Sequence, residues 1–161
     1  MKQLKLVGLF CCLVNLSSCG QFPKDPEKTL RQVTNGTLKV GYSQNKPWVM
    51  GQMGVPTGVE AALVQGFARS VNARVQWVND TEQNLFEKLE QQQLHLVIAG
   101  TTDDTPWKKK IAFTRPYAEV GQKKHVMGVI KGENAFVVAL ESFLHGQKQS
   151  IEAQWRHETH R

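Results

Sequence analysis

The stretch VIAGTTDDTPWKKKIAFTRPY, Val97–Tyr117, is the part of the sequence that decides the fold. It continues an apolar run, "LHLVIAG" (94–100), that is typical of a strand covered on both faces of a sheet. Thr105 and Pro106 predict a helix start, with threonine as N-cap and proline at the first helical position. Phe113–Tyr117 predicts packing and a turn. The polar residues between strand and cap are either a ligand-binding loop or a capped turn.

Strands and helices alternate on both sides of this stretch. "TLKVGYS" (37–43) alternates apolar and polar residues, which predicts a strand. A helix is predicted where Val59, Leu63, Phe67 and Val71 recur every four residues. The remaining predicted elements are a strand over 73–80, a helix over 81–93 capped by Thr81, a strand around 125–130 and a long final helix over 133–155.

This order predicts an α/β fold with an open, mostly parallel sheet flanked by helices. In such sheets the ligand site lies past the carboxyl ends of the strands. The loops at 43–51 and 100–107 follow the first and third predicted strands, so we expect them to lie side by side. Both loops are polar and carry a tryptophan, Trp48 in the first and Trp107 in the second.

The amino terminus has the pattern of a secretory signal. Lys2 and Lys5 precede an apolar run that is too short to span a bilayer, and "LSSC" (16–19) matches the lipobox of bacterial lipoproteins. We therefore expect a signal peptide over 1–18 and a lipid on Cys19, which would anchor the protein to a membrane. An ordinary signal peptide or a short anchor helix is the alternative. The remaining expected parts are a lipidated tether (19–36), a single domain (37–156) and a basic tail (157–161).

Composition excludes several classes of function. The chain has 161 residues and a net charge of +6, but its basic residues are not interleaved with aromatic ones, so no nucleic-acid partner is expected. All three cysteines lie in the predicted signal, so no disulfide or cysteine metal site is expected in the domain. The histidines are scattered, and no catalytic triad or phosphate loop can be assembled. We expect neither a metal, a cofactor nor an enzyme.

The motifs resemble those of the bacterial extracellular solute-binding proteins of family 3, the amino-acid-type receptors of ABC importers. The matching pieces are "LKVGYSQNKPWV" (38–49), "PTGVEAALVQGFARSVNARVQWV" (56–78), "LEQQQLHLVIAGTTDDTPWKKKIAFTRPY" (89–117) and "KGENAFVVALESFL" (131–144). The resemblance implies one lobe of a type II periplasmic binding protein fold. That family has a second lobe of on the order of 100 residues, and only "AEVGQKKHVMGVI" (118–130) stands in its place.

The resemblance also implies a ligand surface. Its residues would be Trp48, Glu60, Gly100, Thr101, Thr102, Asp103, Asp104 and Trp107. Glu60 has a simpler explanation, because an acid at a helix start is favoured by the helix dipole. Trp107 occupies the position of the family's carboxylate-binding arginine, which makes classical α-amino-acid recognition doubtful. The two aspartates beside tryptophans suit a cationic or amine-bearing ligand better.

The expected function is that of a lipid-anchored periplasmic solute-binding protein for a small polar or cationic solute. An ABC-importer membrane component, or a second copy that completes the cleft, would be its partner. The alternative is a non-enzymatic envelope lipoprotein whose single lobe docks another protein.

Overall fold

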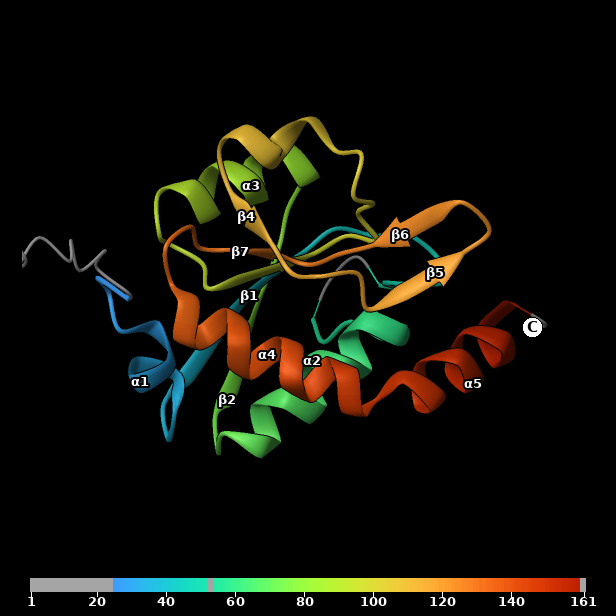
Figure 1. Cartoon of the computed structure of the whole chain (residues 1–161), viewed down its shortest axis with the longest axis horizontal. Helices are drawn as coiled ribbons and strands as arrows, with labels where there is room; N and C mark the ends of the chain where they lie inside the picture. Colours follow the sequence, from blue (N-terminus) through green and yellow to red (C-terminus); the bar gives the residue numbers. More distant parts are fainter. Residues whose placement is uncertain (1–24, 52–53, 160–161) are drawn as a thin grey trace, which may run out of the picture.

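A five-stranded sheet with helices on both faces forms the body of the protein (Figure 1). The structure is a computed structural model that describes residues 25–51 and 54–159. The predicted signal peptide, Cys19 and the last two residues of the predicted tail lie outside the described residues. No helix in the described part of the chain is long and apolar enough to cross a membrane.

The sheet has the strand order β2-β1-β3-β7-β4. The second strand, β1 (Thr37–Tyr42), runs parallel to both the edge strand β2 (Arg74–Asn79) and the central strand β3 (Leu96–Ile98). The short strand β7 (Gly128–Val129) is antiparallel to β3 and to β4 (Ala112–Phe113). The predicted α/β class with a mostly parallel sheet is therefore confirmed.

Helices cover the two faces of the sheet unequally. α2 (Val59–Ser70) and α4 (Asn134–Gly146) lie on one face, and α3 (Glu82–Glu90) lies on the other (Figure 1). The predicted cap of α3 is confirmed, because the Thr81 hydroxyl accepts a hydrogen bond from the Asn84 amide. Each face buries its own cluster of apolar side chains, and the larger cluster lies under α2 and α4.

Two strand glycines let α3 approach the sheet closely. A Cβ at Gly41 would lie 2.7 Å from side-chain atoms of Leu85 and Leu94. A Cβ at Gly128 would lie 2.8 Å from the ring of Phe86. Both distances are shorter than a van der Waals contact, so any larger residue at these positions would push α3 outward.

The predicted long final helix is two helices. α4 ends at Gly146, and α5 (Lys148–Thr159) follows after Gln147. Glycine is a weak helix former, which makes this a low-cost place to break the helix. The break lets α5 change direction, so that Ile151 joins the larger core cluster. The predicted single helix over 133–155 was wrong for this reason.

A short helix, α1 (Thr29–Val33), lies within the segment predicted as a tether. The buried Glu133 carboxylate accepts hydrogen bonds from the amides of Glu27 and Thr29, at 2.8 and 2.7 Å. Val33 is fully buried in the larger core cluster. Residues 25–36 therefore pack on the lobe, and the rest of the predicted tether, residues 19–24, lies outside the described residues.

A two-stranded hairpin stands beside the main sheet. β5 (Ala118–Val120) pairs antiparallel with β6 (Lys123–His125), and Gly121 lies in the turn between them (Figure 1). The sequence predicted one strand around 125–130, and the structure divides this segment between β6 and β7. The hairpin occupies the place in the chain where the resembling family has its second lobe.

Candidate functional site

A hollow of about 650 Å³ lies past the carboxyl ends of β1 and β3. Five segments line it: the loop after β1, the start of α3, the loop after β3, the β5–β6 hairpin and α5. The expectation that the loops at 43–51 and 100–107 meet here is confirmed. Its lining includes Asn45, Lys46, Trp48, Glu82, Gly100, Thr101, Thr102, Asp104, Lys123, His125 and Trp155.

The loop after β1 is closed on itself and tied to β3. Asn45 and Val49 exchange two backbone hydrogen bonds of 2.9 Å, and the Asn45 side chain donates to the Ala99 carbonyl at 2.8 Å. This holds Trp48 with only 5% of its surface exposed, with its ring centroid 3.8 Å from that of His125. The Trp48 ring is part of the floor of the hollow and not an exposed stacking platform.

Glu60 lies beneath the floor. Its carboxylate is fully buried and accepts hydrogen bonds from the Gly100 amide at 2.8 Å and the Tyr117 hydroxyl at 2.6 Å. Burial raises the pKa of Glu60 to about 7, although both hydrogen bonds act in the opposite direction. Glu60 joins α2 to the loop after β3 and to the start of the hairpin, but its side chain does not line the hollow.

Gly100 and Thr101 form the centre of the floor. Gly100 has a φ of +61°, and a Cβ there would lie 2.7 Å from the Asn45 side chain and 2.8 Å from Trp48. Thr101 is 8% exposed, and its hydroxyl oxygen is buried without a hydrogen-bond partner among the described residues. A buried hydroxyl without a partner costs free energy, and a bound ligand could remove that cost.

The other residues of the predicted ligand surface lie in different environments. The Thr102 hydroxyl donates to the Asp104 carboxylate, and both residues line the hollow. That hydrogen bond is the main cause that holds the pKa of Asp104 below its usual range. Asp103 lines a different hollow, behind the loop. Trp107 packs on Phe86 in the smaller core cluster, at 5.3 Å between ring centroids.

Trp107 is turned away from the hollow because of its local helix. Pro106–Lys109 forms the 3-10 helix η1, and the predicted cap is confirmed, since the Thr105 hydroxyl accepts from the Trp107 amide. The smaller core cluster lies next to this turn and takes up the indole. The Lys110 ammonium lies 5.7 Å from the centroid of the same ring.

Sequence reasoning missed several residues that line the hollow. Lys46 and Lys123 bring positive charge, and Glu82 brings a carboxylate from the first turn of α3. Burial raises the pKa of Glu82. No ion pair joins Lys46, Lys123, Glu82 or Asp104 to another residue in the described part of the chain. Their charges are available to a solute.

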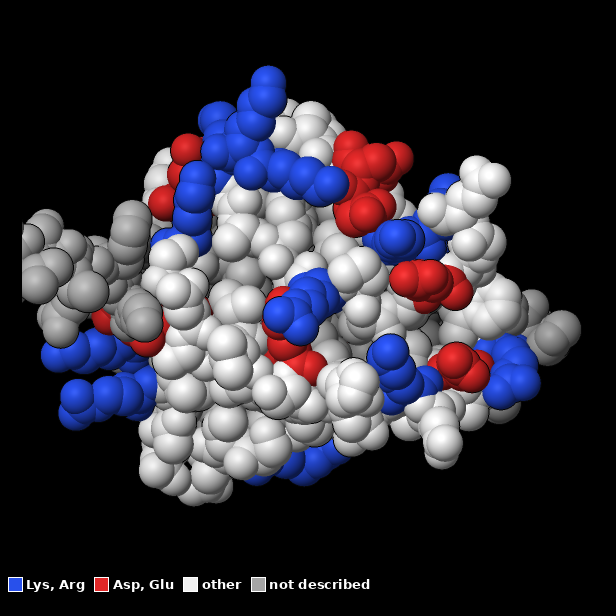
Figure 2. Space-filling view, viewed as in Figure 1, with Lys and Arg blue, Asp and Glu red and all other residues white. Residues whose placement is uncertain are grey.

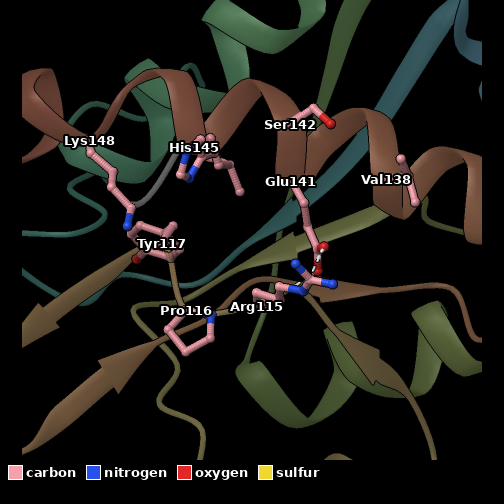
Figure 3. A pocket seen from close by; sticks show the side chains of 9 residues that line it. Arg115, Pro116, Tyr117, Val138, Glu141, Ser142, His145 and Lys148 are labelled. Atoms are coloured by element: carbon pink, nitrogen blue, oxygen red, sulfur yellow. Dashed lines mark hydrogen bonds and ion pairs between the residues drawn. The ribbon is translucent and has the colours of Figure 1, made fainter.

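A second hollow lies between α4 and the residues that lead into the hairpin (Figure 3). Arg115 projects into it and pairs with Glu141, with its Nε 3.5 Å from the carboxylate and its amide 2.7 Å from the same group. The Glu141 carboxylate therefore offsets part of the positive charge that Arg115 and Lys148 bring to this hollow. On the face drawn in Figure 2, basic and acidic side chains lie interspersed, without one dominant sign.

The comparisons with known proteins agree with this geometry. The family described as "Bacterial extracellular solute-binding proteins, family 3" matches residues 38–156. A comparison with curated protein sequences returned no match.

Two solved structures illustrate the likeness of the fold. Arginine-bound domain 1 of TmArgBP, in a Phe57Trp mutant form, is 25% identical with a TM-score of 0.64, over 71% of this chain and 93% of that chain. An ancestral cationic amino acid solute-binding protein, AncCDT-1, is 15% identical with a TM-score of 0.70, over 81% of this chain and 99% of that one.

Fold, family match and structural neighbours all point the same way. The chain belongs to the bacterial extracellular solute-binding proteins of family 3 and has the form of a single lobe of a type II periplasmic binding protein.

Proposed function

We propose that the protein binds a small cationic solute, an amino acid or amine such as arginine, in the hollow between the loops after β1 and β3. The observation that carries the proposal is the Thr101 hydroxyl, which is buried and has no hydrogen-bond partner among the described residues. Thr101 lines the hollow together with carboxylates and lysines that form no ion pair in the described part of the chain. The carboxylates of Glu82 and Asp104 would face the cationic end of the solute, and Lys46 or Lys123 would face a carboxylate if the solute has one.

A single lobe is a reasonable unit for this function. Domain 1 of TmArgBP was crystallised in an arginine-bound form, and its length is almost entirely covered by this chain. That domain therefore holds arginine without its partner lobe. By analogy, the open hollow of this chain would be sufficient for a solute, with fewer contacts than a closed two-lobe site provides.

We further propose that the protein acts in the periplasm, anchored by a lipid on Cys19, as the substrate-binding component of an ABC importer. The family is extracellular and binds solutes, which supports this role. A transporter component or a second copy of the chain would then cover the open hollow. No reaction is proposed.

The proposal is tested by thermal unfolding of the purified protein in the presence of L-arginine, L-lysine, putrescine, L-glutamate and glucose. Binding to the folded state raises Tm, so the cationic compounds should raise it and the other two should not. Titration calorimetry of each compound that raises Tm then gives its Kd.

A matched variant separates charge recognition from general effects on folding. Glu82→Gln combined with Asp104→Asn removes both carboxylates at nearly unchanged volume. We expect this variant to fold normally and to lose the response to cationic compounds. A well-folded wild type with no response to any of them would favour the alternative role, docking of a protein partner.

A further inference from the structure

His125 is held in the wall of the hollow by its backbone on two sides. It is the last residue of β6, it pairs with Ala118 of β5, and it forms a bridge with Thr102 of the loop after β3. Its carbonyl also accepts a hydrogen bond from the Tyr117 amide at 3.0 Å. A side chain on such a framework has little freedom to move away from the hollow.

The hydrogen bond of the His125 ring fixes its tautomer. Nδ1 lies 3.2 Å from the Gly100 carbonyl oxygen. A carbonyl oxygen can only accept, so Nδ1 must carry the proton of this bond. In the neutral ring Nε2 then has a lone pair, and no hydrogen bond joins Nε2 to another residue in the described ranges. The ring therefore offers one acceptor next to the floor of the hollow.

The surroundings of His125 favour the neutral ring. Only 5% of the residue is exposed, and its ring stacks on Trp48. Burial, and to a smaller extent the charge of Lys123, hold the pKa of His125 below its usual range against the opposing effect of the Gly100 bond. At neutral pH the ring accepts at Nε2 and does not donate there.

Charged groups reach the hollow around His125 from each neighbouring segment. They are Lys46 from the loop after β1, Glu82 from α3, Asp104 from the loop after β3 and Lys123 from β6 itself. Tyr117 contacts the ring from the start of the hairpin, and its hydroxyl bonds to Glu60 of α2. No ion pair joins any of these groups to His125 among the described residues.

We propose that His125 is a specificity-determining residue, whose neutral imidazole accepts a hydrogen bond at Nε2 from an N–H group of the bound solute. This inference rests on the proposed binding of a cationic solute and adds a residue and a direction of hydrogen bonding to it. Ammonium and guanidinium groups only donate, so a neutral acceptor selects them over carboxylates.

A proton and the solute would then compete for the same lone pair. A protonated His125 would present an N–H and a positive charge to a cation, which abolishes the hydrogen bond and adds repulsion. Binding should therefore weaken as the pH falls through the pKa of His125. By linkage, a bound cation must lower that pKa by the same free energy.

The test is an NMR titration of the His125 ring carbon-bound proton with and without L-arginine, with the signal assigned by its loss in His125→Gln. At an arginine concentration about ten times Kd, the apparent pKa of His125 should fall by about one unit. His145 lies outside the hollow and provides the internal control, because its ring signals should not respond to arginine.

Two substitutions distinguish the roles of the two ring nitrogens of His125. His125→Asn retains a donor near the Nδ1 position, so it keeps the bond to Gly100 but lacks the acceptor. His125→Gln places an amide oxygen near the Nε2 position. We expect arginine to bind at least tenfold more weakly to His125→Asn, with part of the affinity restored in His125→Gln.

The outcomes are distinguishable. Arginine binding in calorimetry with no change in the pKa of His125 would overturn the role of His125 and leave the proposed function standing. No binding of L-arginine, L-lysine or putrescine to the folded wild type would overturn both.

Discussion

The floor and the rim of the hollow differ in burial and in the interactions that their residues make. The floor, formed by Trp48, Gly100, Thr101 and His125, is buried and held by hydrogen bonds and ring contacts. The rim, formed by Lys46, Glu82, Asp104 and Lys123, is exposed and makes no ion pair with other described residues. The floor therefore determines the shape of the site, and the rim determines which charge enters it. Substitutions that disturb the packing beneath or within the floor should change stability, and those in the rim should change binding. The polar atoms of Thr101 and His125 are the exception in the floor, because we expect them to contact the solute.

The largest effect is expected just beneath the floor, at Glu60. Glu60→Ala leaves the Gly100 amide and the Tyr117 hydroxyl without an acceptor and opens a cavity. Each unsatisfied buried donor costs about 1–3 kcal/mol, so we expect a loss of about 3–5 kcal/mol in the free energy of unfolding. Urea unfolding at pH 5 measures it. Tyr117→Phe, which removes only one of the two donors, should cost less than half as much.

The pH dependence of stability provides the second contrast. The pKa of Glu60 is raised to about 7 in the folded protein, from the ordinary value of 4.5 for a glutamate. Between these values the folded state binds more protons than the unfolded state, so this contribution to stability is present below pH 4.5 and is lost as the pH rises through 7. The loss is on the order of 3 kcal/mol. Unfolding free energies of Glu60→Gln measured from pH 4.5 to 8 should lack this decrease.

A pair of glycines tests how tightly the floor is packed. Gly100 and Gly121 have nearly equal φ values of +61° and +59°, but a Cβ at Gly121 would meet no atom within 4 Å. Alanine costs about 1 kcal/mol in this backbone region at either position. Gly100→Ala should cost about 1–3 kcal/mol more than Gly121→Ala, because its Cβ meets Asn45 and Trp48. Equal losses in urea unfolding would show that the floor is loosely packed.

The rim should show the smallest effect on stability. Lys123→Gln removes an exposed charge without an ion-pair partner among the described residues, and such surface substitutions change stability by no more than about 0.5 kcal/mol. Its binding effect should depend on the solute: weaker affinity for arginine, which has a carboxylate, and unchanged or stronger affinity for putrescine, which has none. An equal loss of affinity for both solutes would indicate that Lys123 supports the structure of the hairpin and does not recognise the solute carboxylate.

Local patterns in the sequence were sufficient for the fold class and for two of the segments around the hollow. Apolar periodicity located β1, α2 and β3, and the caps at Thr81 and Thr105 lie where threonine was expected. The loops after β1 and β3 meet because parallel strands end at the same edge of a sheet. These features depend on residues that are close in sequence.

The remaining features depend on contacts between distant residues. Glu82, Lys123 and Trp155 reach the hollow from three separate segments, and none of them carries a local signal for binding. In the sequence, His125 is one of several scattered histidines. Only the folded hairpin brings its ring against Trp48. Tryptophan is a residue type that suits a ligand contact, but the turn of η1 directs Trp107 into the core.

Thr101 offers the most direct test of the claim that the hollow is a binding site. Thr101→Val keeps the shape of the side chain and removes the buried hydroxyl that has no partner in the described part of the chain. If the hydroxyl serves a solute, the variant should be as stable as the wild type or up to about 1 kcal/mol more stable, and should bind arginine about fivefold to tenfold more weakly in titration calorimetry. Unchanged arginine affinity together with lower stability would contradict the account.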